Sequence, residues 1–461
     1  MIQKQEDMRD APEDFAPIDD AGVEILFSKL EADDQAGLIA ALSSVYPADI
    51  ADFIEQCTAN ERQSLMGLVG EELPAECFSY LHREVRGNVL SWVSDGYIAR
   101  LIAELESDDA IDILEDLDEE QQNAVLAILP NHERLLHEKS LSYPDDSAGR
   151  LMRREAALIP LYWTVGQAID HLRSPDNPIP SDFYCLIIVG RDHRPMGTLP
   201  LSRLIKNHRA IPVARLMDRQ LHSVRADEDQ EQVSQLFRQY GIAEVPVVDD
   251  EDRLIGVITV DDILEVIDEE GEQDMLLMGG LSRDDFFDDL LKTLWARLPW
   301  LSINLITAVL ASLVIFMFED TLSQVVALAI LMPITASMGG NAGTQTLTVA
   351  IRALATQQLT SGNCIRAIGK EIMVGVLNGA IFAIVVAVLT TFWYQDALLG
   401  FAIGSAMLLS LIIAGLAGVV VPILLSWTRI DPAIASGVFL TTITDIVGFG
   451  AFLLLARWVL L

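Results

Sequence analysis

Residues 431–448 read DPAIASGVFLTTITDIVG and place one carboxylate, Asp445, in the middle of an apolar segment. A transmembrane helix needs about 20 predominantly apolar residues, and the run from 434 to 456 is long enough. A charged side chain at the centre of a span costs about 2.5–3.5 kcal/mol on insertion scales and usually faces a polar interior. No basic residue in a predicted span can pair with Asp445, which favours a mobile cation over the alternative, a protonated carboxyl that bridges two helices.

Two neighbouring features of this stretch have a functional and a structural interpretation. Asp431 and Pro432 stand at the expected helix start, where Asp either caps the helix or marks a pore entrance. Thr441 and Thr442 share one helix face with Asp445, and their hydroxyl groups either line that face or bond back to the helix backbone.

The C-terminal third contains further apolar runs, which predict five spans in all. We place them near 297–318, 324–350, 371–393, 398–426 and 434–456. The loops after the second and fourth spans hold Arg352, Arg366, Lys370 and Arg429, whereas the loops after the first and third hold no Lys or Arg. The positive-inside rule then places the N-terminus in the cytoplasm and the C-terminus outside.

The second span carries the sequence PITASMGGNAGTQ (333–345). Pro333 and the glycines are predicted to interrupt the helix and expose carbonyl groups, which is tolerated at membrane depth only where the backbone is buried or lines a wet cavity. Close helix packing on the glycines is the alternative. The polar side chain of Asn341 favours the cavity.

The net charge of −36 resides entirely in the first 292 of the 461 residues, because the remainder holds six basic and six acidic side chains. So acidic a soluble region repels nucleic acid and attracts cations, although a solubilising surface is the plainer interpretation. Four dispersed cysteines without a C-x-x-C motif fit a reducing cytosol. The polar, acidic N-terminus does not have the pattern of a signal peptide.

The soluble region predicts an all-α part followed by an α/β part. Residues 1–20 lack periodicity and are expected to be disordered. Residues 21–140 contain short amphipathic helices, for example YPADIADFIEQC and SDDAIDILEDL, which predict a superhelical domain.

A duplication follows within residues 141–270. CLIIVGRDHRPMGTLPLSRLI (185–205) aligns without gaps on EVPVVDDEDRLIGVITVDDIL, 59 residues later, and each copy reads as strand, turn, strand, helix. The Leu-Met pairs at 151–152 and 216–217 are 65 residues apart, and the Pro-rich insert SPDNPIP (174–180) accounts for the difference. The two copies resemble a tandem CBS pair. Residues 271–296 predict a connecting helix, broken near Gly279-Gly280, that leads into the membrane domain of 297–461.

The chemistry of the membrane part favours magnesium. Mg²⁺ demands octahedral oxygen ligands and loses its water reluctantly, so one or two carboxylates with carbonyls around its hydration shell suit it. A zinc or copper path would favour His, Cys or Met beside the carboxylate. The region after Lys292 has no His, and Cys364 lies in a predicted loop.

Four motifs resemble the MgtE family of magnesium channels: GGNAGTQ (339–345), IRALA (351–355), DPAIASG (431–437) and TDIVG (444–448). The resemblance implies a homodimer with a pore on its twofold axis. The implied pore positions are Asp445, Asn341, the carbonyls of Gly339 and Gly340, and Asp431 near the cytoplasmic mouth, with Thr441 on the face of Asp445.

The resemblance also implies that cytosolic Mg²⁺ binds between the acidic domain, the CBS pair and the connecting helix, and so closes the pore. The matching positions are Glu76, Asp108, Asp112, Asp229, Glu231, Asp262, Glu265, Glu270 and Asp274. Gln273 and Gly241 stand where acids are expected, which predicts weaker or rearranged sites. Asp108 and Asp112, at i and i+4, crowd one helix face, and packing such faces together requires cations between them. Solvated acidic faces remain the alternative.

The expected function is a Mg²⁺-selective uptake channel, not an enzyme, in a bacterial cytoplasmic (inner) membrane, with Mg²⁺ both transported and regulatory. The expected partners are a second copy and the lipid bilayer, with no nucleic acid, and ATP binding in the CBS pair is left open. One alternative is a CBS-regulated transporter of Co²⁺, Mn²⁺ or anions. Another is a membrane-anchored sensor, which gives no reason for an unpaired Asp445.

Overall fold

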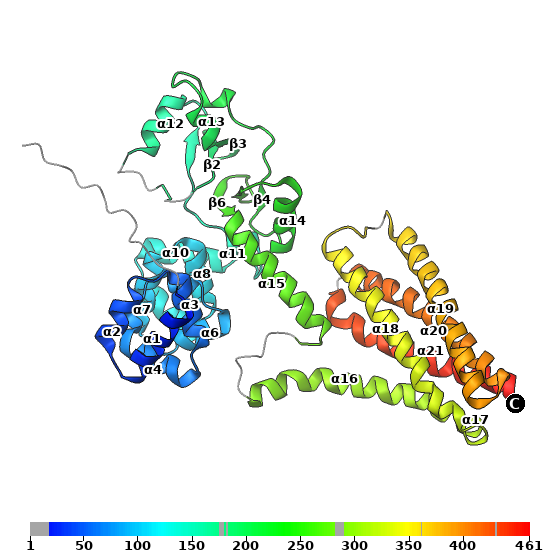
Figure 1. Ribbon diagram of the computed structural model, residues 1–461. Helices are drawn as coiled ribbons and strands as arrows, with labels where there is room; N and C mark the ends of the chain where they lie inside the picture. Colours follow the sequence, from blue (N-terminus) through cyan, green and yellow to red (C-terminus); the bar gives the residue numbers. More distant parts are fainter. Residues whose placement is uncertain (1–17, 175–178, 181–182, 282–289, 361, 429–430) are drawn as a thin grey trace, which may run out of the picture. The chain divides into compact units, whose positions relative to one another are not determined.

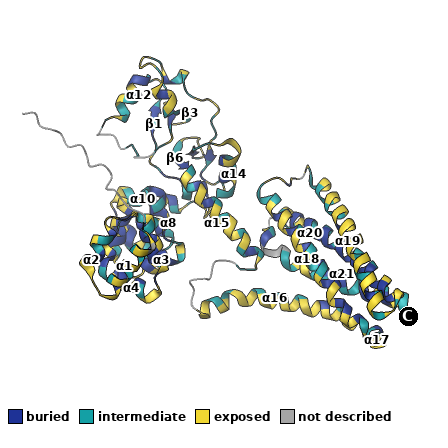
Figure 2. Cartoon of the chain, viewed as in Figure 1, coloured by how far each residue is buried: buried dark blue, intermediate teal, exposed yellow. Residues whose placement is uncertain are grey.

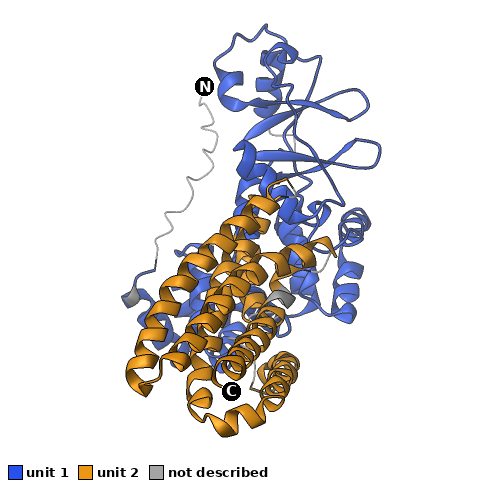
Figure 3. Ribbon diagram, turned by 90° about the vertical axis from the view of Figure 1, so that its right-hand side faces the viewer, with its two compact units in different colours: residues 1–267 blue, residues 268–461 orange. Residues whose placement is uncertain are grey.

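The computed structural model describes residues 18–174, 179–180, 183–281, 290–360, 362–428 and 431–461 (Figure 1). The chain forms two compact units, Met1–Ile267 and Asp268–Leu461, shown in different colours in Figure 3. Most of the expected disordered tail, most of the Pro-rich insert and the middle of the expected connecting segment lie outside the described residues.

The N domain (Asp20–Leu141) is all-helical, as predicted, with short helices around an apolar core that includes Phe53 and Phe78. Side-chain caps fix several helix starts, such as the capping box of Thr58 and Glu61. The α-helices are α1 (Asp20–Glu31), α2 (Gln35–Leu42), α3 (Pro47–Gln56), α4 (Ala59–Val69), α5 (Glu76–Ser79), α6 (Arg83–Leu90), α7 (Asp95–Glu104), α8 (Ser107–Glu115), α9 (Glu119–Ile128) and α10 (Asn131–Leu141).

The duplicated region forms two three-stranded sheets with matching order and register, which confirms the α/β repeat. The first repeat contains β1 (Leu158–Pro160), α12 (Val165–Leu172), β2 (Cys185–Val189), β3 (Pro195–Pro200) and α13 (Leu201–Ile205), and the short helix α11 (Ala148–Leu151) precedes it. The second contains β4 (Val224–Arg225), α14 (Gln230–Tyr240), β5 (Glu244–Val248), β6 (Leu254–Thr259) and the start of α15 (Val260–Met278). Cys185 pairs with Pro200 as Glu244 pairs with Thr259. The turns match too, because His193 and Asp252, 59 residues apart, both have positive φ.

Each repeat also pairs with the segment that leads into the other repeat. Arg153, ahead of the first repeat, bridges Val257 on β6, and Asp218, ahead of the second repeat, bridges Thr198 on β3. These two bridges are equivalent under the internal symmetry. The exchange brings Arg153 to the last strand of the second sheet, 104 positions along the chain from its bridge partner.

The second compact unit consists mainly of long helices: α16 (Leu290–Phe316), α17 (Glu319–Gln324), α18 (Ala327–Ala355), α19 (Cys364–Tyr394), α20 (Ala397–Trp427) and α21 (Pro432–Leu460). Among the described residues, four helical stretches are long and apolar enough to cross a membrane, on α16, α19, α20 and α21. α20 is buried along much of its length against α18, α19 and α21, whereas the outer sides of α16 and α19 expose large apolar side chains (Figure 2). Such apolar surface is suited to lipid.

α18 corrects the expectation of a broken second span, because it is one continuous helix through Pro333 and the glycines. The glycines instead permit close helix packing. A Cβ on Gly339 would lie 2.5 Å from Ser410 Oγ, and one on Gly418 of α20 would lie 2.8 Å from the Gly343 carbonyl oxygen. The packing interpretation therefore holds for this backbone. α18 has the length of a span but not the apolarity of its neighbours, since polar side chains occur on several of its sides.

The close approach of α20 to α18 gives a test. We expect Gly418→Ala to lower the free energy of unfolding by about 1–3 kcal/mol, because the new methyl group meets backbone that has no rotamer to change. Gly340→Ala is the matched control, since a Cβ there meets open space. Thermal unfolding of the purified full chain in detergent measures both. Equal stability of the two variants would contradict the packing assigned to Gly418.

Candidate functional site

The candidate pore residues lie on α18 and α21, which pack antiparallel. Gly343 of α18 faces Leu440 of α21, and Gly448 of α21 faces Ala336 of α18. This register brings Asn341 and Asp445 to within about one helical turn of each other along the helix axes. The structure thus brings to one level two residues that are 104 positions apart in the sequence.

Asp445 is half-buried and has no hydrogen-bond or ion-pair partner among the described residues. The Thr441 hydroxyl donates to the carbonyl oxygens of Gly437 at 3.0 Å and Val438 at 3.1 Å, so the back-bonding interpretation describes its present contacts. Asp431 caps α21 by accepting from the Ala433 amide at 2.7 Å. The Gly339 and Gly340 carbonyls belong to the continuous helix α18, so the structure does not expose them as an unwound segment would.

A pocket of about 230 Å³ adjoins Thr441. Thr344 and Thr348 of α18 and Asn304 and Trp300 of α16 line it with polar and aromatic groups. Sequence reasoning missed Asn304, because a lone Asn in a predicted span has no motif around it. At the edge of the same unit, burial, and then the nearby Asp431 carboxylate, raise the pKa of Asp274. The structure therefore brings together Asp274 and Asp431, which were expected in different roles.

The first compact unit contains a cluster of carboxylates between the N domain and the second repeat. Asp108, Asp109 and Asp112 come from α8, and Asp262 and Glu265 come from the start of α15. Burial, followed by the charge of Asp262, raises the pKa of Asp109 to about 6. Part of the Asp112 side chain reaches solvent, but protein atoms surround the residue and remove much of its hydration. This desolvation, with the charges of Glu115 and Glu265, raises the pKa of Asp112 to about 7. Burial also raises the pKa of Asp108, Asp262 and Glu265.

Two buried arginines that sequence reasoning missed lie in this cluster. Arg86 of α6 pairs with Asp116 at 2.5 Å, and the carboxylates of Asp116, Asp112 and Glu265 raise its pKa against the opposing effect of burial. Arg153 pairs with Glu106 at 2.7 Å and reaches Asp262 at 3.4 Å. No sequence motif marks either residue, because each acquires its partners through tertiary packing.

The other expected sensor residues lie apart from this cluster or have a structural role. Glu76 is exposed on the short helix α5. Asp229 caps α14 by accepting from the Glu231 amide, as Thr164 caps α12 in the first repeat. Gly241, which stands where an acid was expected, ends α14 at φ 61°, a conformation that favours glycine. Glu270 and the exposed Gln273 lie on the part of α15 that belongs to the second compact unit.

Two further observations concern ligands. The donors in the carboxylate cluster are all oxygens, which suits Mg²⁺ chemistry. In the described part of the chain, no three His, Cys, Asp or Glu side chains are arranged to hold a metal ion among them. An open pocket of about 460 Å³ in the first repeat, lined in part by Tyr162, Arg191 and His193, is of the size of small-molecule sites.

The comparisons with known proteins define the class. The family described as divalent cation transporter matches residues 332–455, the MgtE intracellular N domain matches residues 45–146, and the CBS domain matches residues 213–269, the second repeat. These matches indicate a multidomain protein of the divalent cation transporter class, with an MgtE-type N domain and a CBS domain ahead of the membrane unit.

Two full-length relatives identify the family. The chain is 32% identical to the magnesium transporter MgtE of Bacillus subtilis (strain 168), over 88% of this chain and 90% of that protein. It is 31% identical to the magnesium transporter MgtE of Thermus thermophilus, over 94% and 97% of the two chains. A crystal structure of the soluble part of a magnesium transporter is 27% identical, with a TM-score of 0.47, and covers 54% of this chain and 98% of that one. The chain belongs to the MgtE family.

The raised carboxyl pKa values predict how the stability of the cluster depends on pH. The pKa values of Asp109 and Asp112 lie above the ordinary Asp value of about 4, so the folded state binds protons more tightly than the unfolded chain does. Without divalent cations, we expect the thermal midpoint of the full chain to fall as the pH rises from 5.5 to about 8, through pKa values of about 6 and 7.

Differential scanning fluorimetry in chelator measures this pH dependence. Asp112→Asn is expected to flatten the upper part of the profile, because the uncharged amide does not titrate. Asp95→Asn, at a half-buried acid in the first turn of α7 and outside the cluster, is the control. A midpoint that rises with pH over the same interval would contradict the assignment.

Proposed function

We propose that this chain is a Mg²⁺ channel that mediates magnesium uptake, with its pore on the α18–α21 face. The observation that carries the proposal is the unpaired Asp445 carboxylate, held level with Asn341 in a helix pair inside the membrane-spanning unit. A carboxylate at this depth needs a partner, and a cation that keeps part of its hydration shell is the partner that oxygen donors suit. The names of the relatives, magnesium transporters, support Mg²⁺ as the cargo.

The pore proposal includes a homodimer and an orientation. A single α18–α21 face presents one Asp445, and a twofold axis beside it would double the carboxylates around an ion path. The basic loops predicted after the second and fourth spans support a cytoplasmic N-terminus. The proposal keeps the domain boundaries predicted from the sequence, which are 21–140, 141–270, 271–296 and 297–461.

We further propose that cytosolic Mg²⁺ closes the channel by binding at the carboxylate cluster of α8 and α15. Its members repel one another across the contact between the N domain and the second repeat. The charge of Asp262 disfavours ionisation of Asp108 and Asp109 and so raises the pKa of both carboxyls. Divalent cations relieve such repulsion, so high Mg²⁺ favours the docked arrangement and low Mg²⁺ favours separation.

The pore assignment is tested in a bacterium that lacks its own Mg²⁺ uptake systems. We expect the parent chain to restore growth in low Mg²⁺ and Asp445→Asn to fail, because the amide is neutral at nearly the same size. Asp396→Asn is the control, since Asp396 caps α20 outside the span interiors. Equal rescue by Asp445→Asn at equal membrane abundance would remove the pore assignment. Uptake assays with Co²⁺ and Mn²⁺ in the same strains decide the alternative cargo.

The gating assignment is tested with two neutralised carboxylates. We expect the double variant Asp262→Asn, Glu265→Gln to stay active at Mg²⁺ concentrations that close the parent, because fewer charges bind Mg²⁺ in the docked state. The control is Asp268→Asn, Glu272→Gln, which removes the same charge from exposed positions on the same helix. Patch-clamp currents over a range of cytosolic Mg²⁺ give the comparison. Unchanged inhibition in the first variant would exclude this cluster as the sensor.

A further inference from the structure

We propose that Arg153 is a resident counter-ion that joins the N domain to the second repeat without metal, and so sets the Mg²⁺ concentration at which the gate responds. The second half of this statement rests on the gating function proposed above, whereas the first half concerns the docking alone. The inference comes from contacts on both sides of one guanidinium group.

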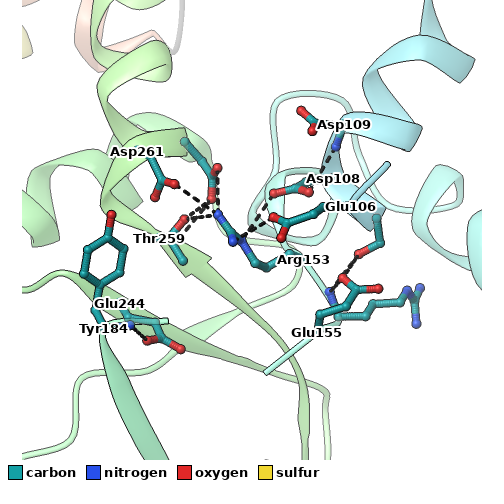
Figure 4. A network of polar contacts seen from close by, with 12 residues as sticks. Glu106, Asp108, Asp109, Arg153, Glu155, Tyr184, Glu244, Thr259 and Asp261 are labelled. Atoms are coloured by element: carbon teal, nitrogen blue, oxygen red, sulfur yellow. Dashed lines mark hydrogen bonds and ion pairs between the residues drawn. The ribbon is translucent and has the colours of Figure 1, made fainter. Parts of the chain in front are cut away.

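The guanidinium of Arg153 bridges the N domain and the second repeat (Figure 4). On the N-domain side, its Nη1 lies 2.7 Å from Glu106 Oε2 and its Nε lies 3.6 Å from Asp108 Oδ2, the second being an ion pair too long for a hydrogen bond. On the side of the second repeat, its Nη2 lies 3.3 Å from Asp261 Oδ2 and 3.4 Å from Asp262 Oδ1. One cation therefore serves four carboxylates.

The position of Arg153 is fixed by its backbone and not only by its charge. Its amide donates to the Val257 carbonyl at 2.9 Å, and the Val257 amide donates to the Arg153 carbonyl at 2.8 Å. Nη2 also donates to the Thr259 hydroxyl at 2.6 Å. Since this two-way bridge is part of the exchange between the repeats, the guanidinium is presented from the second repeat with its side chain only 6% exposed. A preorganised cation of this kind loses little conformational freedom on docking.

The two residues after Arg153 add links to the N domain. The Arg154 amide donates to the Ser107 hydroxyl at 2.8 Å, and that hydroxyl donates to Glu155 Oε2 at 2.8 Å. The Arg154 guanidinium donates to the Leu136 carbonyl of α10 at 2.8 Å. These hydrogen bonds do not require Mg²⁺.

The carboxylates of the cluster form two groups, those in contact with Arg153 and those outside its contacts. Burial opposes the charge on Arg153, but the carboxylates of Asp262, Asp108, Glu106 and Asp261 outweigh burial and raise its pKa. Asp109, Asp112 and Glu265 lie outside the contacts of Arg153. Docking consequently has a constant part, supplied by Arg153, and a variable part, supplied by cations at the remaining carboxylates. Removal of the constant part shifts the midpoint of Mg²⁺-dependent docking to higher concentration.

The test is hydrogen exchange of the full chain in detergent, read on peptides that span 105–117 and 148–157, in chelator and over a Mg²⁺ titration. For Arg153→Gln we expect exchange about tenfold faster than the parent in chelator, and a midpoint of Mg²⁺ protection about tenfold higher, with full protection regained at saturating Mg²⁺. Arg209→Gln is the control, because it removes the same charge from an exposed pair with Asp170 in the first repeat.

The outcomes separate this inference from the gating function. If the parent shows Mg²⁺-dependent protection and Arg153→Gln matches it in both chelator and Mg²⁺, the counter-ion role is overturned. If Arg153→Gln loses protection in chelator while Mg²⁺ protects neither protein, the docking role stands and the gating function fails. Arg153→Lys, which keeps the charge but not the fork, is expected to shift the midpoint less, and it decides the matter if the Gln variant does not fold. A Lys variant that matches the parent would then overturn the proposal.

Discussion

Repulsion between carboxylates is the constraint on which the first compact unit of this molecule depends. α8 and the start of α15 present acidic residues to each other, and the charge of Asp262 acts on both Asp108 and Asp109. Such a contact forms only with protons, metal ions or basic side chains between the acids. Arg153 and Arg86 supply basic side chains from different elements, one ahead of the first repeat and one on α6. Part of the repulsion across this contact is therefore offset by side chains of the protein itself.

The membrane unit depends on the opposite condition, which is close contact without charge. Gly339, Gly343, Gly418 and Gly448 let α18, α20 and α21 approach until backbone and side-chain atoms meet. In lipid, where burial of apolar surface gives little net gain, such packing supplies much of the helix association. The polar side chains of α18 and the Asp445 carboxylate are thereby held in a defined register, although Asp445 has no charged partner among the described residues.

Local pattern predicts much of the fold. The 59-residue offset predicts the repeated unit of strand, turn, strand and helix, and the structure adds that the two hairpins share their register and a positive φ in the turn. The continuity of α18 is not predictable in this way, since Pro and Gly disfavour a helix locally and only the facing residues of α20 and α21 show why they are tolerated. Arg153 is the clearest example. Its role depends on a bridge to a strand 104 positions away, and no window of sequence contains both partners.

α15 takes part in both the carboxylate cluster and the membrane unit. Its first turns carry Asp262 and Glu265, and its last turns carry Asp274. The helix is unbroken over its 19 residues, or about 28 Å at 1.5 Å per residue. It stops at Met278, where Gly280 takes φ 79° and lies so close to the Trp300 indole of α16 that a Cβ has no room. The end of the helix is thus seated against a spanning helix by a contact that a side chain at 280 would prevent. α15 therefore carries acidic charge in its first turns and ends in a tight steric contact after its last turn.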